Sequence, residues 1–236
     1  MIEAASRLRV VTWNVHRCIG RDGKRNVARV SACIRALAPD IAAFQEVDTL
    51  SGSSGEDDTY RHLCAQVGDH GHDAWTVSGA DGNYGQVLAS RYHLSDKRVH
   101  DISVPGYEPR RVMEAHVALP GASIRVIATH LGLRRRERQR QVERLRDIVT
   151  GDLSSPVLLL GDFNEWFRPH VAQRTLFDPF DHWTAHASFP SRLPVLPLDR
   201  IMCGAGTALL SSRAVREAAH ASDHLPVVAE ISVPAT

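Results

Sequence analysis

The sequence predicts an α/β protein built from mixed β-sheets, and three features of its hydrophobic pattern support this. Apolar residues recur at helical spacing after residue 26 and again between residues 134 and 149, each time between two strand-like runs. Between about residues 73 and 130, strand patterns follow one another without a convincing helix. Because parallel strands need long crossovers, this block is expected to be largely antiparallel. The strands are too many for one flat sheet in a chain of this size.

Length and composition predict one domain spanning residues 1–236. With 236 residues, 43% of them hydrophobic, the chain can bury a large core. A net charge of +1 argues against a nucleic-acid binder held by overall charge but leaves room for a local basic patch. The N-terminus lacks the apolar core of a signal peptide and no apolar run approaches membrane-spanning length, so a soluble cytoplasmic protein is expected. The four cysteines are scattered and are expected to be reduced: Cys18, Cys33, Cys64 and Cys203.

The first part of the chain predicts a strand, a helix and a second strand. Residues 8–13 form an apolar run. Asn26, a preferred capping residue, precedes apolar side chains on one helical face, and the helix is expected to stop before Pro39. Residues 40–44 form a short buried strand that is expected to end in Gln45-Glu46. The next segments are predicted as a loop at 49–58, a short helix at 60–67, and strands at 74–77, 86–90, 98–104, 112–119 and 124–129.

The last part of the chain predicts an arginine-rich helix followed by a fully buried strand. Residues 134–147 carry seven arginines against three acids, and a single apolar stripe indicates an amphipathic helix with a cationic outer face. Residues 157–160 are apolar without a break, as expected of a strand buried on both faces. Residues 167–197 are irregular and rich in proline, and further strands are expected from 199 and over 225–232.

Polar side chains follow strand after strand at the point where each one ends. Asp162 and Asn164 come directly after the buried strand, and residues two apart in an extended chain point the same way. Each such group alone has an ordinary explanation as a turn or a solvated side chain. Together, without a serine or cysteine nucleophile motif, they favour metal-assisted hydrolysis with oxygen ligands for Mg²⁺ or Mn²⁺. The full set is Asn14, Glu46, His130, Asp162, Asn164, Asp199, Asp223 and His224.

Seven short motifs, in this order, resemble the endonuclease/exonuclease/phosphatase superfamily over about residues 8–232. They are Thr-Trp-Asn-Val-His, Phe-Gln-Glu-Val-Asp, Leu-Ala-Ser-Arg-Tyr, Ala-Thr-His-Leu-Gly-Leu, Gly-Asp-Phe-Asn, Leu-Asp-Arg-Ile and Ser-Asp-His. That superfamily includes deoxyribonucleases, abasic-site endonucleases, inositol polyphosphate 5-phosphatases and neutral sphingomyelinases. The resemblance implies a four-layer α/β/β/α sandwich with the active site where the strands of both sheets end.

The resemblance also implies a role for each strand-end residue. Glu46 is similar to the family's principal metal ligand, with Asn14 beside it and Asp223 as a carboxylate near the metal. Asp162 and Asn164 resemble the pair that orients the attacking water and the phosphate. The remaining implied roles are His224 as the imidazole facing the phosphate and Asp199 as the residue that holds its tautomer.

His130 narrows the resemblance to the deoxyribonuclease and sphingomyelinase branch, where the strand before the long helix ends in a Thr-His pair. A second histidine could protonate the leaving oxygen while His224 serves the opposite face of the phosphate, and both are expected to titrate. Gln86 stands where many relatives have Asn or Glu, and Arg111 resembles a family arginine on the neighbouring strand. Both are expected to bind substrate, although Arg111 has an alternative role as a structural salt-bridge partner.

The resulting prediction is an Mg²⁺-dependent phosphodiesterase, with Mn²⁺ as a possible substitute. A phospholipid-type or small diester is the preferred substrate, a DNA or RNA nuclease is the alternative, and a non-catalytic binding module of the same fold is a third. Specificity is expected in the loops 51–58, 102–110 and 167–197. The arginine-rich helix is either a solvated face or a dock for an anionic membrane surface or polynucleotide, through arginines such as Arg135, Arg138 and Arg140. The number of metal ions and the oligomeric state stay open.

Overall fold

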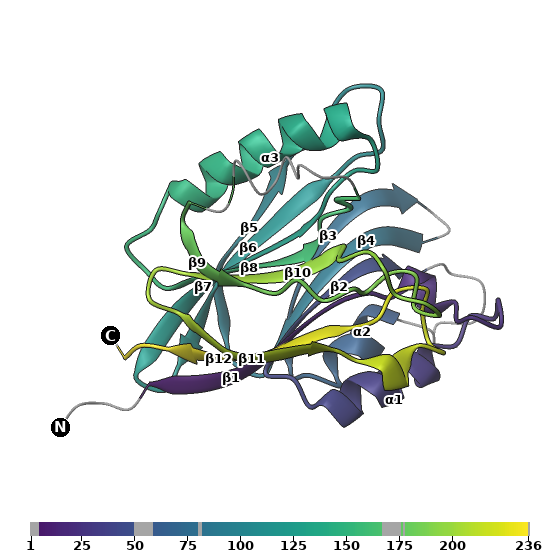
Figure 1. Cartoon of the computed structure of the whole chain (residues 1–236), viewed down its shortest axis with the longest axis horizontal. Coiled ribbons are helices and arrows are strands. Elements are labelled where there is room, and N and C mark those ends of the chain that lie inside the picture. The colour runs from purple at the N-terminus through teal and green to yellow at the C-terminus, as the bar shows by residue number, and fades with distance from the viewer. Residues whose placement is uncertain (1–4, 50–58, 80–81, 167–175, 177, 236) are drawn as a thin grey trace.

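Two six-stranded sheets face each other in the computed structural model, which describes residues 5–49, 59–79, 82–166, 176 and 178–235 (Figure 1). The first sheet has the order β11-β12-β1-β2-β4-β3. Its strands are β1 (Ser6–Asn14), β2 (Ile41–Asp48), β3 (His70–Gly79), β4 (Gly82–Ser90), β11 (Ala208–Ala214) and β12 (Val227–Val233). The second sheet has the order β5-β6-β7-β8-β10-β9. Its strands are β5 (Leu94–Asp101), β6 (Arg111–Leu119), β7 (Ala122–His130), β8 (Val157–Asp162), β9 (Phe180–Trp183) and β10 (Asp199–Gly204).

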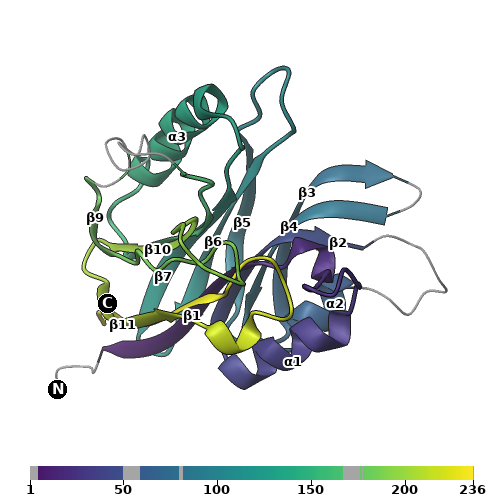
Figure 2. The ribbon, with the colours of Figure 1, turned by 45° about the vertical axis from the view of Figure 1, so that its right-hand side comes forward.

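Helices cover the outer face of each sheet, so the protein is a four-layer α/β/β/α sandwich, as predicted. Helices α1 (Val27–Leu37) and α2 (Thr59–Cys64) pack on the first sheet, and α3 (Arg135–Thr150) packs on the second (Figures 1 and 2). Apolar side chains fill three layers: one between the sheets, one under α1 and α2, and one under α3. Two short 3₁₀ turns complete the described elements: η1 (His16–Cys18) and η2 (Arg216–Ala218).

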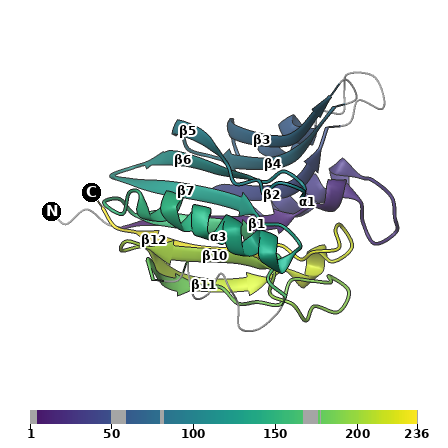
Figure 3. The same cartoon turned by 90° about the horizontal axis from the view of Figure 1, so that it is seen from above.

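Each sheet contains one parallel strand pair joined through a helix. In the first sheet β1 pairs with β2 through α1, and in the second β7 pairs with β8 through α3. Seen from above, α3 lies across the second sheet near β7 (Figure 3). Strand β1 also contacts β8 and β10 across the core. In both βαβ units the parallel strands are central and buried, which explains their nearly unbroken apolar runs.

An arginine fixes the end of the crossover helix in each βαβ unit. Arg9 in β1 donates to the carbonyl of Leu37 (3.1 Å), the last residue of α1, and pairs with Glu230 (2.6 Å) on β12. Arg125 in β7 donates to three carbonyls around the end of α3 and pairs with Glu114 (2.6 Å) on β6. The C-terminal carbonyls of a helix have no partner within the helix, so both arginines satisfy groups that would otherwise need water.

The predicted strands and helices are present, but their bounds and their distribution between the sheets differ from the prediction. Asn26 caps α1, accepting from the backbone NH of Arg29 (2.9 Å). The block 73–130 is antiparallel, but its strands divide between the two sheets. Strands β9 and β11 were not predicted. The expected loop 51–58 lies outside the described residues. So do residues 167–175 and 177 of the expected loop 167–197.

The arginine-rich helix is only partly the cationic outer face that the sequence predicts. Arg138 is buried: it donates to the carbonyls of Gly132 and Leu133 and lies 3.7 Å from Glu165. Glu137 is buried too, and accepts from Gln141 instead of pairing with an arginine side chain. Among the described residues, none of the helices has the length and apolar character needed to cross a membrane.

Candidate active site

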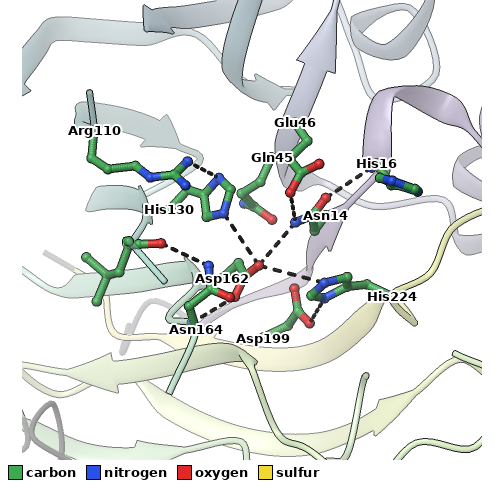
Figure 4. Close-up of polar contacts among 12 residues, drawn as sticks. Asn14, His16, Gln45, Glu46, Arg110, His130, Asp162, Asn164, Asp199 and His224 are labelled. Carbon is green, nitrogen blue, oxygen red and sulfur yellow. Dashed lines mark hydrogen bonds and ion pairs between the residues drawn. The ribbon is translucent and has the colours of Figure 1, made fainter. Parts of the chain in front are cut away.

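Polar residues from several strands of both sheets converge at one edge of the sandwich (Figure 4). In the second sheet His130 is opposite Asp162 on the adjacent strand, and Asp162 is opposite Asp199 on the next. Three neighbouring strands therefore present three polar side chains side by side. From the first sheet, Asn14 at the end of β1 reaches the same place and donates to Asp162 (3.1 Å).

Asn14 joins the two sheets through its side-chain amide. Its Nδ2 donates to Glu46 Oε1 (2.9 Å) and to Asp162 Oδ2 (3.1 Å), and its Oδ1 accepts from the backbone NH of His16 (3.0 Å). The Asn14 amide therefore lies between two carboxylates that come from different sheets.

Glu46 reaches the site from a bulge within β2, whereas the sequence predicted that the strand ends in Gln45-Glu46. The pairing of β2 with β4 shifts register between Phe44 and Val47, and the strand then continues to Asp48. Glu46 has a φ of 56°, in the left-handed region that non-glycine residues rarely adopt. The bulge turns this carboxylate toward Asn14 instead of leaving it in the strand alternation.

The turn after β8 sets Asp162 and Asn164. Gly161 has a φ of 150°, and a Cβ there would overlap the carbonyl of Thr129 on β7, so only glycine fits. Asp162 Oδ1 accepts from the backbone NH of Asn164 (2.9 Å), while the Asn164 side chain donates to the carbonyl of Leu131 (2.9 Å). Burial, reinforced by the nearby Asp199 carboxylate, raises the pKa of Asp162 to about 6.

His224 is held by a buried carboxylate on one side and an aromatic ring on the other. Its Nδ1 lies 2.8 Å from Asp199 Oδ2, and its ring centroid lies 4.7 Å from that of Phe189. Burial alone would lower the pKa of His224, but the surrounding carboxylates, Asp199 first, raise it to about 10. These carboxylates therefore favour the protonated imidazole, whose Nε2 lies 3.9 Å from Asp162 Oδ2.

His130 has the opposite surroundings. Its Nδ1 lies 3.1 Å from Nη1 of the buried Arg110, and its Nε2 lies 3.6 Å from Asp162 Oδ2. Burial, with the Arg110 charge and then His224 adding to it, holds the pKa of His130 well below its usual range. The two imidazoles on two sides of Asp162 therefore have pKa values shifted in opposite directions.

These groups line a cavity of about 200 Å³ with a polar floor and a partly apolar mouth. Sequence reasoning missed its wall residues Tyr84, Glu108, Arg110, Leu133, Trp166, Phe189 and Leu198. Leu133 is 60% exposed and Trp166 is 41% exposed, so both offer apolar surface at the mouth. Glu108, Arg110 and Phe189 lie in loops where specificity was expected, and the Arg110-Arg111 pair at the start of β6 marks two candidates of which strand alternation turns one inward.

Gln86 and Arg111, predicted to bind substrate, lie outside the residues that line this cavity. Arg111 Nη1 donates to Ser103 Oγ (3.0 Å) and forms an ion pair with Asp101. Gln86 Nε2 donates to the backbone carbonyl of Arg111 (2.9 Å). Arg111 therefore makes the kind of ion pair that the sequence offered as its alternative role, and its neighbour Arg110 lines the cavity.

The donor set fits a hard divalent cation. Asp162, Asp199 and His224 place potential ligand atoms within 4.8 Å of one another. Asp199 Oδ2 and His224 Nδ1 are engaged with each other, so this trio is better suited to fixing the imidazole than to enclosing an ion. Glu46 and Asn14 offer oxygen ligands at the open side, and the half-exposed Asp223 lines the same cavity with Oδ1 3.6 Å from His16 Nδ1. Carboxylate and amide oxygens are the ligands that Mg²⁺ and Mn²⁺ prefer.

A four-layer sandwich with carboxylates, amides and imidazoles at a shared strand edge defines a class of hydrolytic phosphoesterase folds. The model of the endonuclease/exonuclease/phosphatase family matches residues 11–224 of this chain. The chain belongs to that family, which includes metal-dependent phosphoesterases and nucleases.

Three individual proteins match this chain over nearly its whole length. Uncharacterized protein YbhP of Escherichia coli K12 is 30% identical over 243 residues, covering 94% of this chain and 95% of YbhP. An endonuclease/exonuclease/phosphatase from Beutenbergia cavernae shares the fold with a TM-score of 0.76 at 22% identity, over 97% of this chain and 72% of that one. The mannosyl-6-phosphatase Bt3783 of Bacteroides thetaiotaomicron shares it with a TM-score of 0.73 at 15% identity, over 95% and 99%.

Proposed function

We propose that the chain is a single-domain, divalent-metal-dependent phosphodiesterase that directs water onto a phosphodiester. The observation that carries this proposal is the Asn14 amide held between Glu46 and Asp162, next to the Asp199–His224 pair. The arrangement joins oxygen ligands to a fixed imidazole, and no serine, threonine or cysteine is among the described residues that line the cavity. That combination serves metal-assisted hydrolysis.

Glu46, Asn14 and Asp223 would hold the ion, Mg²⁺ or Mn²⁺. When bound, such an ion polarises a phosphoryl oxygen and offsets the charge that develops in the transition state. Asp162, whose pKa is raised, and Asn164, which is fixed on Leu131, face the position of the attacking water. His224 brings a positive charge to the phosphate oxygens, and Asp199 keeps its ring oriented through Nδ1.

The cavity mouth supports a small or lipid-type ester group on the phosphate. Leu133, Trp166 and Phe189 line it, and Trp166 packs on Phe189 with ring centroids 5.9 Å apart. An apolar group beside the phosphate would gain contact area there, roughly 25 cal/mol for each Å² of apolar surface removed from water. The mannosyl-6-phosphatase shows that the same fold also accommodates a monoester substrate, so the substrate choice rests on the cavity and not on the fold.

A substrate panel tests this proposal directly. Phospholipid-type diesters, a small chromogenic diester, a monoester and duplex DNA are each offered with Mg²⁺ and with Mn²⁺. We expect cleavage of the diesters that disappears in excess chelator and returns when the metal is restored. An Asp162→Asn preparation purified in parallel controls for contaminating phosphatases. Undiminished activity in chelator would rule out the metal mechanism.

A nuclease is the second candidate, because exposed arginines adjoin the cavity mouth. Arg134, Arg135 and Arg136 follow directly after Leu133 and are exposed, whereas Arg138 is not. Attraction of a polynucleotide by such charges weakens as salt rises. Salt-sensitive cleavage of duplex DNA that is lost in Arg135→Ser/Arg136→Ser would favour the nuclease. The matched control is Arg7→Ser/Arg146→Ser, which also removes two positive charges. Arg7 lies near the start of β1 and Arg146 near the end of α3, so both are at the ends of these elements away from the cavity.

A further inference from the structure

The contact between Arg110 and His130 is a second point at which an imidazole of the site is fixed (Figure 4). Arg110 immediately precedes β6 and is 4% exposed, and its Nη1 lies 3.1 Å from His130 Nδ1. Arg110 lines the cavity beside His130, so this contact belongs to the site and not to the protein surface.

The chemistry of the two groups determines which one donates. A guanidinium has only N–H donors and keeps its charge, so it cannot accept a hydrogen bond. His130 Nδ1 must therefore be the acceptor in this contact. A histidine whose Nδ1 accepts is neutral and carries its one ring proton on Nε2. That nitrogen is the one 3.6 Å from Asp162 Oδ2, on the side of the ring that faces the catalytic carboxylate.

Arg110 is itself held in place on several sides. Its Nη2 donates to Glu108 Oε2 (3.0 Å), and its backbone NH donates to Ser103 Oγ (3.1 Å). Its carbonyl accepts from the backbone NH of Ile102 (3.1 Å). Its Nε has no hydrogen-bond partner among the described residues. The cost of keeping a buried cation with one unsatisfied donor is consistent with a role in the site, where such costs concentrate.

We infer that Arg110 is a positioning residue that fixes His130 as the Nε2–H tautomer, so that His130 serves the reaction as a neutral hydrogen-bond donor. This inference rests on the proposed function for the reaction itself. A neutral imidazole aimed at a phosphate oxygen strengthens its hydrogen bond as negative charge grows on that oxygen, without transferring a proton. The role differs from the one expected from the sequence, in which both histidines exchange protons.

The asymmetry with His224 supports the assignment. The charged groups facing His130 are Arg110, Asp162 and His224, and the nearest is a cation. The nearest group to His224 Nδ1 is the Asp199 carboxylate, which accepts a hydrogen bond and so requires a proton on Nδ1. His130 Nδ1 therefore carries no proton, because it faces an obligatory donor. His224 Nδ1 carries one, because it faces an acceptor.

The tautomer is tested by NMR on the ¹⁵N-labelled full chain near neutral pH, without substrate or metal. Long-range ¹H–¹⁵N correlation distinguishes the two ring nitrogens, and a His130→Gln spectrum assigns the signals. We expect Nε2 of His130 in the protonated range and Nδ1 in the unprotonated range. A proton on Nδ1, or on both nitrogens, would overturn the inference, and this reading holds whether or not the protein hydrolyses a phosphodiester.

Variants of Arg110 then connect the tautomer to the rate. Arg110→Glu places an acceptor at Nδ1, so we expect a proton on Nδ1 and a kcat lower by about 10²–10³-fold, the range for losing one transition-state donor, with KM little changed. Arg110→Lys retains a donor-only cation and is expected to restore the Nε2–H signature and most of kcat. Arg7→Glu makes the same charge change far along β1 and should leave both unchanged. An Arg110→Glu protein that folds and keeps the Nε2–H signature would contradict the assignment.

Discussion

In each βαβ unit of the sandwich an arginine–glutamate pair fixes the end of the crossover helix, but the two pairs differ in how deeply they are buried. In β1–α1–β2 the fixing pair Arg9–Glu230 is partly exposed, with side chains 43% and 37% accessible. In β7–α3–β8 the corresponding pair Arg125–Glu114 is buried, with side chains 4% and 6% accessible. Exposed ion pairs contribute little because water screens them, whereas breaking a buried pair leaves a charge without compensation. The second unit should therefore depend far more on its arginine.

The units also differ in what they bring to the site. The first brings Asn14 and Glu46, which are hydrogen-bonded to each other and are proposed to hold the cation. The second brings His130 and Asp162, which face the proposed water and phosphate. If this division holds, damage to the first unit should respond to metal concentration and damage to the second should not.

The largest expected effect separates the two units at the site. Asp162→Asn should reduce kcat by on the order of 10⁴-fold, the upper end of what one acid–base group contributes, and added metal should not restore it. Glu46→Gln should cost about 10²–10³-fold and recover in part as Mg²⁺ is raised, because a ligand charge has been removed. Steady-state rates across a metal titration measure both. If the two variants recovered equally as metal is raised, the proposal that only the first unit holds the metal would be wrong.

The next effect concerns the stability of the second unit. Arg125→Ala removes one of the two partners of buried Glu114, leaving His100, and three hydrogen bonds to the carbonyls of Ile148, Val149 and Asp152. We expect the free energy of unfolding to fall by about 3–5 kcal/mol, the range for breaking a buried ion pair. Urea denaturation followed by circular dichroism measures the loss. A loss below that of the Arg9 variant would contradict the comparison.

The pH dependence of stability gives a smaller, complementary effect. Burial alone would raise the pKa of Glu114, but hydrogen bonds from Arg125 and His100 lower it below its ordinary value of 4.5. A carboxyl group with a depressed folded-state pKa stabilises the protein above the unfolded value, and this contribution is lost as pH falls through the folded value. Unfolding free energies measured downward from pH 5 should therefore decline less steeply in Glu114→Gln than in the natural protein. Parallel declines would show that Glu114 is not the group responsible.

The smallest expected effect belongs to the first unit. Arg9→Ala should lower the free energy of unfolding by about 0–1 kcal/mol, as is usual for an exposed pair, and less still at high salt. The same denaturation experiment at low and high salt measures it, with Arg125→Ala as the matched partner. A loss as large as that of Arg125→Ala would mean that exposure does not decide the difference between the units.

Sequence reasoning reached the residues whose placement depends on local geometry. Asp162 and Asn164 follow a buried strand at a fixed spacing, and Asp199 and His224 lie in short motifs, so their convergence was foreseeable. Arg110 was missed in favour of Arg111 because a shift of one residue along a strand exchanges the inward and outward faces. The edge strands β9 and β11 were missed because their mostly exposed residues lack a strong apolar alternation.

The left-handed backbone of Glu46, at φ 56°, has a consequence for selection and engineering. Holding a side-chain-bearing residue in that region costs on the order of 1–3 kcal/mol, which glycine would largely avoid. Glu46→Gly would therefore relax the bulge while removing a proposed metal ligand. A screen for thermal tolerance alone would accept that change, whereas a screen for turnover would reject it. Asn164, at φ 49°, lies in the same region, but asparagine tolerates this conformation better than glutamate. Of these two positions, position 46 is therefore the one where thermal stability and activity are more directly opposed.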